Sequence, residues 1–283
     1  MKQLKDKVAV ITGGGSGLGR EFALCCARRG MALVLADVDE QGLAETVQQV
    51  EASAPGVQAI TRRVDVSRLE EVQGLAEFAK SRFGSVHLLF NNAGVGVSGP
   101  VWEYTAADWQ WVLGVNLLGV AWGIKAFVPI MIAQGEGHVV NTASAAGWMS
   151  SAGSAIYSAS KSAVVSISET LVLDLKDADA NIGVTCLSPA FFATAIANSA
   201  RNRPAELAET APDSPLRRKR EEMLRYAVEH GRLSAAEIAE MTLQAVEENR
   251  FYVFPHRKIK SLIQARAEAA QEEKQAFDPM SAG

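Results

Sequence analysis

Short apolar runs recur along most of the chain, and longer amphipathic stretches separate them. The runs are four to seven residues long. Several are apolar at nearly every position, which is typical of parallel strands buried on both faces. Seven runs are predicted as strands: residues 8–12, 32–36, 58–64, 86–90, 138–142, 183–187 and 251–254.

The stretches between these runs have the period of an α-helix. Helices are predicted over residues 40–54, 67–83, 106–133 and 234–249, the last with Ser234 as its N-cap. Strands that alternate with helices through short links favour a parallel sheet with right-handed crossovers. The predicted fold is therefore α/β: one doubly wound (Rossmann-type) parallel sheet of about seven strands flanked by helices. Without a linker or repeat, residues 1–283 are interpreted as one domain.

Composition narrows the class of protein. Of the 283 residues, 48% are hydrophobic and 21% are charged, as in an ordinary globular protein. No apolar run approaches the roughly 20 residues that span a bilayer, and the N-terminus has no signal-peptide core. The formal charge of −4 argues against a nucleic-acid surface. Cys25, Cys26 and Cys186 lack metal-ligand spacing, so we expect reduced core thiols, no metal and a cytoplasmic location.

A glycine-rich turn lies between the first strand and the helix that follows it. It reads Gly13-Gly-Gly-Ser-Gly-Leu-Gly19. Glycines let the backbone approach a ligand, and the helix N-terminus offers N–H groups to a diphosphate. A lone glycine-rich turn is weak evidence, but the strand before it and the helix after it supply the required context. A P-loop is excluded because Arg20 follows where Gly-Lys-Ser/Thr is needed.

Asp37 ends the second strand, 18 residues after Gly19. A carboxylate at this place can bind both hydroxyls of an adenosine ribose and would repel the extra phosphate of NADP. Val38 offers no arginine to that phosphate, and Ser16 is uncharged. NAD is therefore the predicted cofactor. The alternative is an Asp that only caps the next helix.

Other small or polar residues also follow predicted strands. Asp65-Val66 follows the third strand, Asn92-Ala93-Gly94 the fourth and Pro189 the sixth. In a doubly wound sheet, ligands bind at these carboxyl ends. We expect Asp65 beside an adenine, and close passage of the backbone past a cofactor at residues 92–94.

Tyr157 and Lys161 are the candidates for proton transfer. They are i and i+4 on a helix that begins after Ser154, so their side chains share a face. Lowering a tyrosine pKa from about 10 by roughly three units needs about 4 kcal/mol. A cation about 4 Å away supplies that order at an effective dielectric near about 20. Ser144, after the fifth strand, could hold a substrate oxygen. The alternative is an ordinary amphipathic pair.

Asn116 is an amide within the apolar part of the predicted helix over residues 106–133. A buried amide needs hydrogen-bond partners. Structural bonds to the backbone would satisfy it. A role in holding water, or in a backbone kink near the active site, is the alternative.

Taken together, these motifs resemble the short-chain dehydrogenase/reductase family, in its compact single-domain branch. The likeness covers about residues 5–254 and includes Thr12. It implies that Tyr157 is the acid/base, that Ser144 positions the substrate oxygen and that Asn116 joins a water-linked proton relay. Lys161 would lower the Tyr157 pKa and bind the nicotinamide ribose. The cofactor-binding set becomes Gly13, Ser16, Gly17, Leu18, Gly19, Asp37, Asp65, Val66, Asn92, Ala93, Gly94, Tyr157, Lys161, Pro189, Phe192 and Thr194.

The sequence departs from the family after the sixth strand. The usual Pro-Gly is Pro189-Ala190 here, and alanine lacks glycine's freedom at positive φ. The backbone conformation at Ala190 is therefore not predicted from the resemblance. Pro189 and Thr194 still match the family positions that line the nicotinamide.

Residues from about 190 to 233 are polar, helix-prone and broken by prolines, and by resemblance they form a mobile lid over the substrate. The substrate-binding set is Ser144, Val95, Trp148, Tyr157 and Phe191, which indicates a bulky, apolar or aromatic secondary alcohol or ketone. The basic run 217–220 is interpreted as a solvated helix face, with an anionic-substrate patch as the alternative.

The residues after about 255 form a basic and then acidic helical tail that could pack on another subunit, and by resemblance we expect a homo-oligomer, a dimer or tetramer. The part from His230 onward is also similar to bacterial aryl-ether side-chain alcohol dehydrogenases. The predicted activity is hydride transfer between NAD and a secondary alcohol or ketone. A dinucleotide-sensing protein without catalysis is the alternative. A serine hydrolase using Ser144 lacks both the Gly-x-Ser-x-Gly elbow and a plausible histidine.

Overall fold

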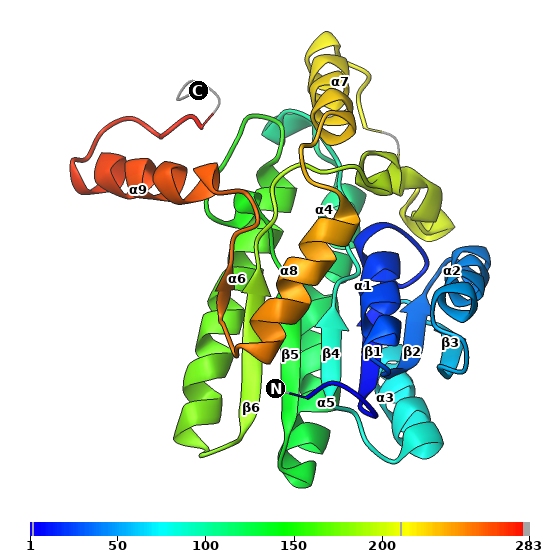
Figure 1. Cartoon of the computed structure of the whole chain (residues 1–283). Coiled ribbons are helices and arrows are strands. Elements are labelled where there is room, and N and C mark those ends of the chain that lie inside the picture. The colour runs from blue at the N-terminus through cyan, green and yellow to red at the C-terminus, as the bar shows by residue number, and fades with distance from the viewer. Residues whose placement is uncertain (2, 210, 280–283) are drawn as a thin grey trace.

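The computed structural model describes residues 1, 3–209 and 211–279. Its centre is one seven-stranded sheet in the order β3-β2-β1-β4-β5-β6-β7, and every neighbouring pair is parallel (Figure 1). The predicted fold class is confirmed. The strands are β1 (Val8–Thr12), β2 (Ala32–Asp37), β3 (Ala59–Arg63), β4 (Leu88–Asn91), β5 (Gly137–Thr142), β6 (Ile182–Leu187) and β7 (Tyr252–Val253).

Continuous burial explains why these segments are strands. Every residue of β1, β4 and β5 is buried, as expected for strands covered by helices on both faces. The strand order reverses between β1 and β4, because the chain goes from β1 outward to β3 and then returns to β4. In doubly wound sheets this switch point opens a crevice at the carboxyl ends of the strands.

Two helical layers cover the sheet. α1 (Gly17–Arg28), α2 (Glu40–Ser53) and α8 (Ala235–Glu247) share one apolar core, which includes Phe22, Leu43 and Leu243. α3 (Leu69–Phe83), α5 (Gly119–Gln134) and α6 (Ala155–Asp177) share the other, with Leu75 and Phe127. The apolar faces read from the sequence are therefore the faces that pack on the sheet.

The helix expected over residues 106–133 is not a single α-helix. It consists of α4 (Ala106–Leu113), a π-helical segment (Gly114–Leu118) and α5. By length and composition residues 106–134 are apolar enough to cross a membrane, with a mean hydropathy of 1.7 over an 18-residue window, which the expectation from the sequence had excluded. In this structure the stretch covers the sheet, since α5 packs against α3, β4 and β5.

Two helix starts test the expected caps. Ser234 forms a capping box with Glu237 at the start of α8, as predicted. Ser154 stands at the N-cap position of α6, but its hydroxyl does not bond a first-turn N–H. It donates instead to the carbonyl oxygen of Ser151 at 2.7 Å. The loop before α6 uses this serine to close its own turn.

Among its described residues, the chain between β6 and α8 has no strand, as predicted. It forms two short 3-10 helices, η4 (Ala195–Asn202) and η5 (Ala205–Leu207), and then α7 (Pro215–Glu229). α9 (Lys258–Gln271) follows β7 and stands away from the sheet at the left of Figure 1. Ile259 is its one buried residue. These segments lie at the carboxyl ends of the strands and surround the crevice.

Candidate active site

A cleft of about 1570 Å³ lies at the carboxyl ends of the strands. This volume exceeds that of a usual small-molecule pocket, about 300–1,000 Å³, and leaves room for a dinucleotide and a second molecule. The predicted cofactor residues that line it are Gly13, Ser16, Gly17, Leu18, Asp37, Asp65, Val66, Asn92, Ala93, Gly94, Tyr157, Lys161, Pro189, Phe192 and Thr194. Gly19 is the exception, since it is buried beneath the glycine loop.

The backbone geometry of the loop between β1 and α1 explains its glycines. Gly13 and Gly17 have φ angles of +69° and +51°, which side chains rarely adopt. A Cβ on Gly13 would lie 2.8 Å from the Cα of Ala93, and one on Gly19 would overlap the Gly13 carbonyl oxygen. Ser16 precedes α1 without a side-chain capping bond. The first-turn N–H groups of α1 can therefore bind a diphosphate.

Asp37 turns its carboxylate toward this loop. Oδ2 accepts from the N–H of Gly15 at 2.9 Å, and Oδ1 accepts from the N–H of Asp39 at 3.1 Å. Burial raises the pKa of this carboxyl group, and the backbone bonds oppose that shift. Capping of α2 falls to Asp39, which accepts from the N–H of Gly42. Asp37 is thus free of the capping role and stands where ribose hydroxyls could bind.

Two arginines near the end of β3 were missed in the sequence. The register of β2 and β3 sets Arg63 beside Asp37, and Arg63 and Arg68 both line the cleft. Arg63 lies 3.9 Å from Glu71, and Arg68 lies 3.7 Å from Asp65. Arg63 is 26 residues from Asp37 in sequence, and only the strand register brings the two together. The end of the cleft near Asp37 therefore contains paired charges of both signs.

A hydrogen-bonded latch joins the ends of β1, β4 and β5. The Thr12 hydroxyl accepts from the N–H groups of Asn92 and Ala93 at 2.9 and 3.1 Å, and donates to the Phe90 carbonyl at 3.0 Å. Thr142 donates to the Asn92 side-chain oxygen at 3.4 Å. These bonds fix the backbone of residues 92–94 along the cleft, where the sequence predicted close passage of a cofactor.

Ser144, Tyr157 and Lys161 meet at the middle of the cleft. All three line it: Ser144 and Lys161 are buried, at 8% and 3% exposure, and Tyr157 is partly buried. Tyr157 and Ser144 are joined by a side-chain hydrogen bond. Lys161 Nζ lies 5.8 Å from the centre of the Tyr157 ring and donates to the Thr142 carbonyl oxygen at 2.7 Å. A hydroxyl, a phenol and a cation thus face one pocket.

The expected direction of the tyrosine shift was wrong. Burial raises the pKa of Tyr157, and the Ser144 hydrogen bond opposes that rise. Burial also lowers the pKa of Lys161 to about 8, because desolvation disfavours the charged form of either group. Attraction between the two groups alone would lower the pKa of Tyr157, but burial outweighs it. Tyr157 therefore stays protonated at neutral pH.

Asn116 lies in the π-helical segment and is fully buried. Its Oδ1 accepts from the N–H of Val95 at 2.8 Å, and its Nδ2 donates to the Val95 carbonyl at 3.0 Å and to Ser160 Oγ at 3.1 Å. Structural bonding to the backbone is thus observed. The segment itself is π-helical, an irregularity that often marks functional sites, and the kink and the water-holding role stay predictions. Asn116 holds the Val95 backbone beside the helix of Tyr157.

The departure at Ala190 is accommodated. The φ angle of Ala190 is not positive. Its backbone therefore has a conformation that alanine adopts without strain. Its N–H donates to His256 Nδ1 at 3.1 Å. The Pro189 carbonyl accepts from the N–H of Ala145 at 2.8 Å. Thr194 then returns to the glycine loop, since a Cβ on Gly17 would lie 3.7 Å from its methyl carbon.

The profile of the short chain dehydrogenase family matches residues 7–205, which hold the glycine loop and the Ser144, Tyr157 and Lys161 group. The chain belongs to the short-chain dehydrogenase family. The resemblance read from the sequence is confirmed, and this short-chain dehydrogenase is an oxidoreductase by family.

Three comparisons extend over nearly the whole chain. A CLA biosynthesis dehydrogenase/reductase of Lactiplantibacillus plantarum is 34% identical over 270 residues, or 94% of this chain and 93% of the relative. A C alpha-dehydrogenase of Sphingobium sp. is 33% identical over 95% and 87% of the two chains, so the looser subgroup likeness also appears. A Burkholderia phymatum family member crystallised with NAD is 47% identical, with a TM-score of 0.96 over 99% of both chains.

The prediction that Trp148 binds substrate is wrong, because its side chain points away from the cleft. Val95 and Phe191 line the cleft of this short-chain dehydrogenase, but Trp148 does not. Its indole N–H donates to Ser188 Oγ at 2.9 Å, and its ring packs against Tyr252 and Phe254. These partners turn the indole toward β7. Sequence could not give this direction, because neighbouring positions on the loop face opposite ways: Met149, the next residue, lines the cleft.

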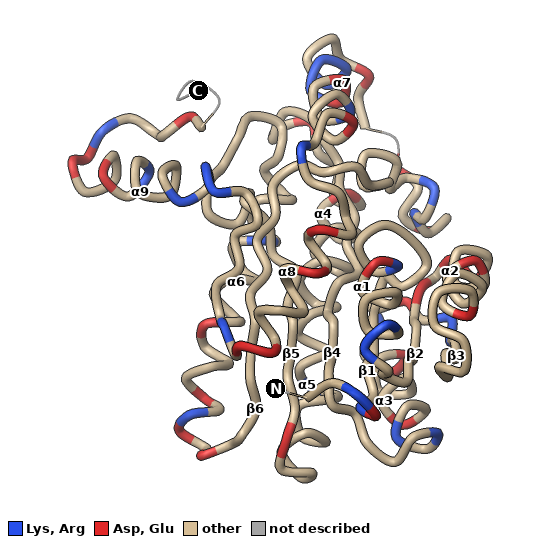
Figure 2. Tube along the Cα trace, viewed as in Figure 1, with Lys and Arg blue, Asp and Glu red and all other residues tan. Residues whose placement is uncertain are grey.

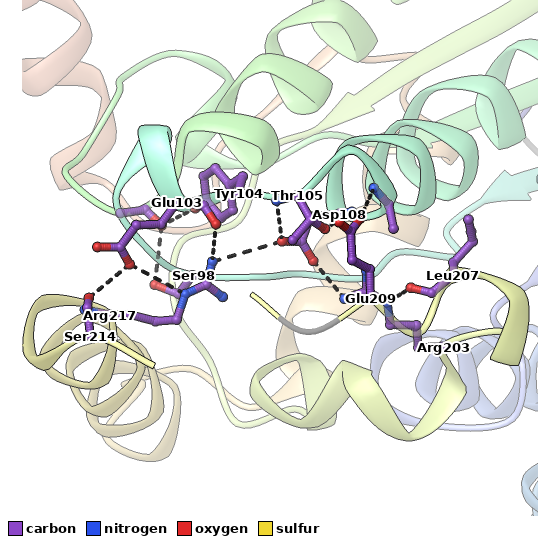
Figure 3. Close-up of polar contacts among 12 residues, drawn as sticks. Ser98, Glu103, Tyr104, Thr105, Asp108, Arg203, Leu207, Glu209, Ser214 and Arg217 are labelled. Carbon is purple, nitrogen blue, oxygen red and sulfur yellow. Dashed lines mark hydrogen bonds and ion pairs between the residues drawn. The ribbon is translucent and has the colours of Figure 1, made fainter. Parts of the chain in front are cut away.

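Charged residues join the segment over residues 190–233 to α4 (Figure 3). Arg203 donates to Asp108 at 2.6 Å, and Asp108 is almost completely buried. Arg217 lies 3.8 Å from Glu103 and 3.9 Å from Asp108. Ser214 donates to Glu103 at 2.9 Å. The interpretation of residue 217 as a solvated helix face was therefore wrong, since its side chain is 11% exposed.

Proposed function

We propose that this short-chain dehydrogenase transfers a hydride between NAD and a secondary alcohol or ketone, with Tyr157 as the proton donor and acceptor. One observation carries the proposal: Ser144, Tyr157 and Lys161 line the same cleft as the glycine loop and Asp37. A dinucleotide on the loop would direct its far end toward this group. An inactive dinucleotide-sensing protein would not need the three side chains together.

The residues present fit NAD. Asp37 is a carboxylate beside the loop that binds diphosphate, which favours a free ribose and disfavours a ribose phosphate. The NAD-bound structure of the Burkholderia phymatum relative supports the same choice. When bound, NAD supplies a nicotinamide ring that accepts or gives the hydride. Lys161 and Thr194 would hold that end of the dinucleotide, and the N–H groups of Gly17 and Leu18, which line the cleft, its diphosphate.

Each polar residue of the central group has a separate task. Ser144 donates a hydrogen bond to the substrate oxygen and holds it next to the Tyr157 hydroxyl. Tyr157 gives its proton to that oxygen when a ketone is reduced, and its raised pKa keeps it protonated for this step. Alcohol oxidation requires the reverse transfer. The Lys161 ammonium favours it, because a nearby cation stabilises the tyrosinate.

Apolar side chains favour a bulky apolar or aromatic substrate. Val95, Met149 and Phe191 line the same cleft as the central group. The two long matches, to a CLA biosynthesis dehydrogenase/reductase and a C alpha-dehydrogenase, support the class. We further propose that residues 190–233 act as a lid, held by Asp108 of α4 and by Glu103, which precedes α4. Asn116 positions the Val95 backbone under that lid.

A substrate panel tests the reaction. Aryl, alicyclic and small aliphatic secondary alcohols, and the matching ketones, are combined with NAD(H) or NADP(H) and followed by the absorbance of the reduced nicotinamide. We expect turnover with NAD to exceed turnover with NADP, and bulky alcohols to exceed small ones in kcat/KM. Turnover of none of them would contradict the reaction class. A clear preference for small alcohols would contradict the substrate class alone.

A further inference from the structure

Cationic side chains are paired with carboxylates at one end of the cleft and lack such partners among the described residues at the other. At the adenosine end, Arg68 lies 3.7 Å from Asp65 and 3.6 Å from Glu206, and Arg63 faces Glu71. At the other end stand Arg220, Arg232, Arg257 and Lys258, which we call the basic rim. Within the part of the chain that the structure describes, these four make no ion pair.

The basic rim is unusual for this chain. The chain has a formal charge of −4, yet its described residues line the cleft with nine cationic side chains and five carboxylates. Near the rim itself, the tail contributes one of those carboxylates, Asp278. Electrostatic focusing in a cleft that carries one sign of charge attracts molecules of the opposite sign. The dinucleotide diphosphate belongs at the glycine loop, so it does not account for these cations.

Backbone contacts gather the rim around residues 190–192. Gly231, which precedes Arg232, packs so closely that a Cβ on it would lie 2.8 Å from the Phe191 carbonyl oxygen. His256, which precedes Arg257 and Lys258, accepts from the N–H of Ala190 at 3.1 Å. In Figure 2, blue marks both the chain just after α7 and the start of α9. Two segments distant in sequence thus bring cations next to residues 190–192.

Apolar side chains line the cleft from the same part of the chain as the rim. Met223, Leu224 and Val228 of α7 line it, as do Leu233, Ile259 and Leu262, which are neighbours in sequence of Arg232, Arg257 and Lys258. A molecule that reaches from the reacting centre to the rim must therefore be apolar along its body. It must be anionic at its far end to gain from the rim.

Resting on the proposed function, we propose that the substrate is a carboxylate-bearing secondary alcohol or ketone with an extended apolar body, whose carboxylate binds the basic rim. The hydroxyl or keto group then reaches Tyr157 and Ser144. Arg232, Arg257 and Lys258 are exposed, so they contribute mainly to capture and orientation and less to the chemical step. The rim would select among substrates without taking part in proton transfer.

The test compares each acid with its own methyl ester. The probes are a mid-chain hydroxy fatty acid and an aryl hydroxy acid, each paired with its ester, at low ionic strength. We expect kcat/KM for the acids to exceed that for the esters by about tenfold, from several exposed charge contacts. The triple variant Arg232→Gln/Arg257→Gln/Lys258→Gln should lose this ratio, with ester turnover and the KM for NAD unchanged. Added salt should reduce the ratio in the wild type only.

A control removes cations from α7 and α9, which adjoin the rim segments, at positions outside the cleft. Arg218→Gln/Lys260→Gln changes exposed residues of α7 and α9 that do not line it, and it should keep the full acid-to-ester ratio. Equal turnover of acid and ester by the wild type, or a ratio that survives the triple variant, would overturn the rim. An equal loss of kcat/KM for the esters in the triple variant, or an equal weakening of the KM for NAD, would also overturn it.

A second readout separates the rim from the reaction. Calorimetric titration of acid and ester into the Tyr157→Phe variant with NAD measures binding without turnover. Tighter binding of the acid, lost in the variant that also carries the triple change, supports the rim even if no alcohol is turned over. Equal binding of acid and ester rejects it, even where NAD-linked turnover of other alcohols supports the proposed function.

Discussion

Different interactions hold the glycine-loop end and the lid end of the cleft: close backbone packing at the first and ion pairs between side chains at the second. At the first, backbone atoms touch: Gly13 lies against Ala93, and Gly19 lies beneath the Gly13 carbonyl. At the second, side chains up to 114 residues apart in sequence hold residues 190–233 through charge, with Asp108 and Glu103 facing Arg203 and Arg217. Steric contacts tolerate almost no change, whereas ion pairs can open and can be replaced. We infer that the fold keeps a fixed nucleotide site and an adjustable substrate site.

The largest effect is expected where the backbone is closest. Gly19→Ala forces a Cβ into the Gly13 carbonyl, so we expect a loss of about 3 kcal/mol in unfolding free energy and more than about 100-fold in NAD affinity. Thermal unfolding and calorimetric titration measure the two. The control is Gly56→Ala, which has φ of +88° and nothing within 4 Å. It should cost about 1–2 kcal/mol from strain and leave NAD affinity unchanged. Unchanged NAD affinity in Gly19→Ala would contradict a sterically fixed site.

At the lid end, Asp108→Asn tests the role of charge. It leaves Arg203 and Arg217 without their shared carboxylate, which at a partly buried site costs about 2 kcal/mol, or about 30-fold in kcat/KM for the alcohol. The KM for NAD should stay the same. Asp213→Asn makes the same change at an exposed pair of the same segment and should have little effect. An equal loss for alcohol and NAD would mean that the two ends of the cleft are not independent.

Cofactor choice gives a smaller effect. Asp37→Ala removes the carboxylate that would repel a ribose phosphate, so the ratio of kcat/KM for NAD to that for NADP should fall by about tenfold. Asp39→Ala removes a nearby carboxylate that caps α2 and should lower stability by about 1 kcal/mol without changing the ratio. A ratio that moves equally in both variants would assign the preference to general charge instead of to Asp37.

The smallest effect is a pH dependence of the sheet. Burial lowers the pKa of His138, in β5, to about 3, and its ring bonds Thr185 at 2.8 Å. The unfolded chain binds a proton here below about pH 6.5 while the folded chain does not. Unfolding free energy should therefore fall as the pH drops through that range, by about 1 kcal/mol at pH 6. His138→Gln should remove this part of the slope in urea titrations. The same slope in both proteins would exclude His138 as its source.

Local patterns predicted what depends on neighbours in sequence. The strands, the glycine loop, Asp37 and the Tyr157–Lys161 face were all read from runs or spacings of a few residues. The charges that hold the lid were not, because Arg203 and Asp108 are 95 residues apart and no local pattern joins them. The direction of Trp148 depends on Ser188, Tyr252 and Phe254. The raised pKa of Tyr157 depends on burial, which only the assembled cleft determines.

Replacing Tyr157 by phenylalanine tests the proposed chemistry most directly, because it removes one hydroxyl and leaves the ring. We predict a fall of about 10³-fold in turnover of the best alcohol, with NAD affinity by calorimetry within about twofold of the wild type. Turnover near the wild-type rate, with NAD still bound, would contradict the assignment of Tyr157 as the group that moves the proton.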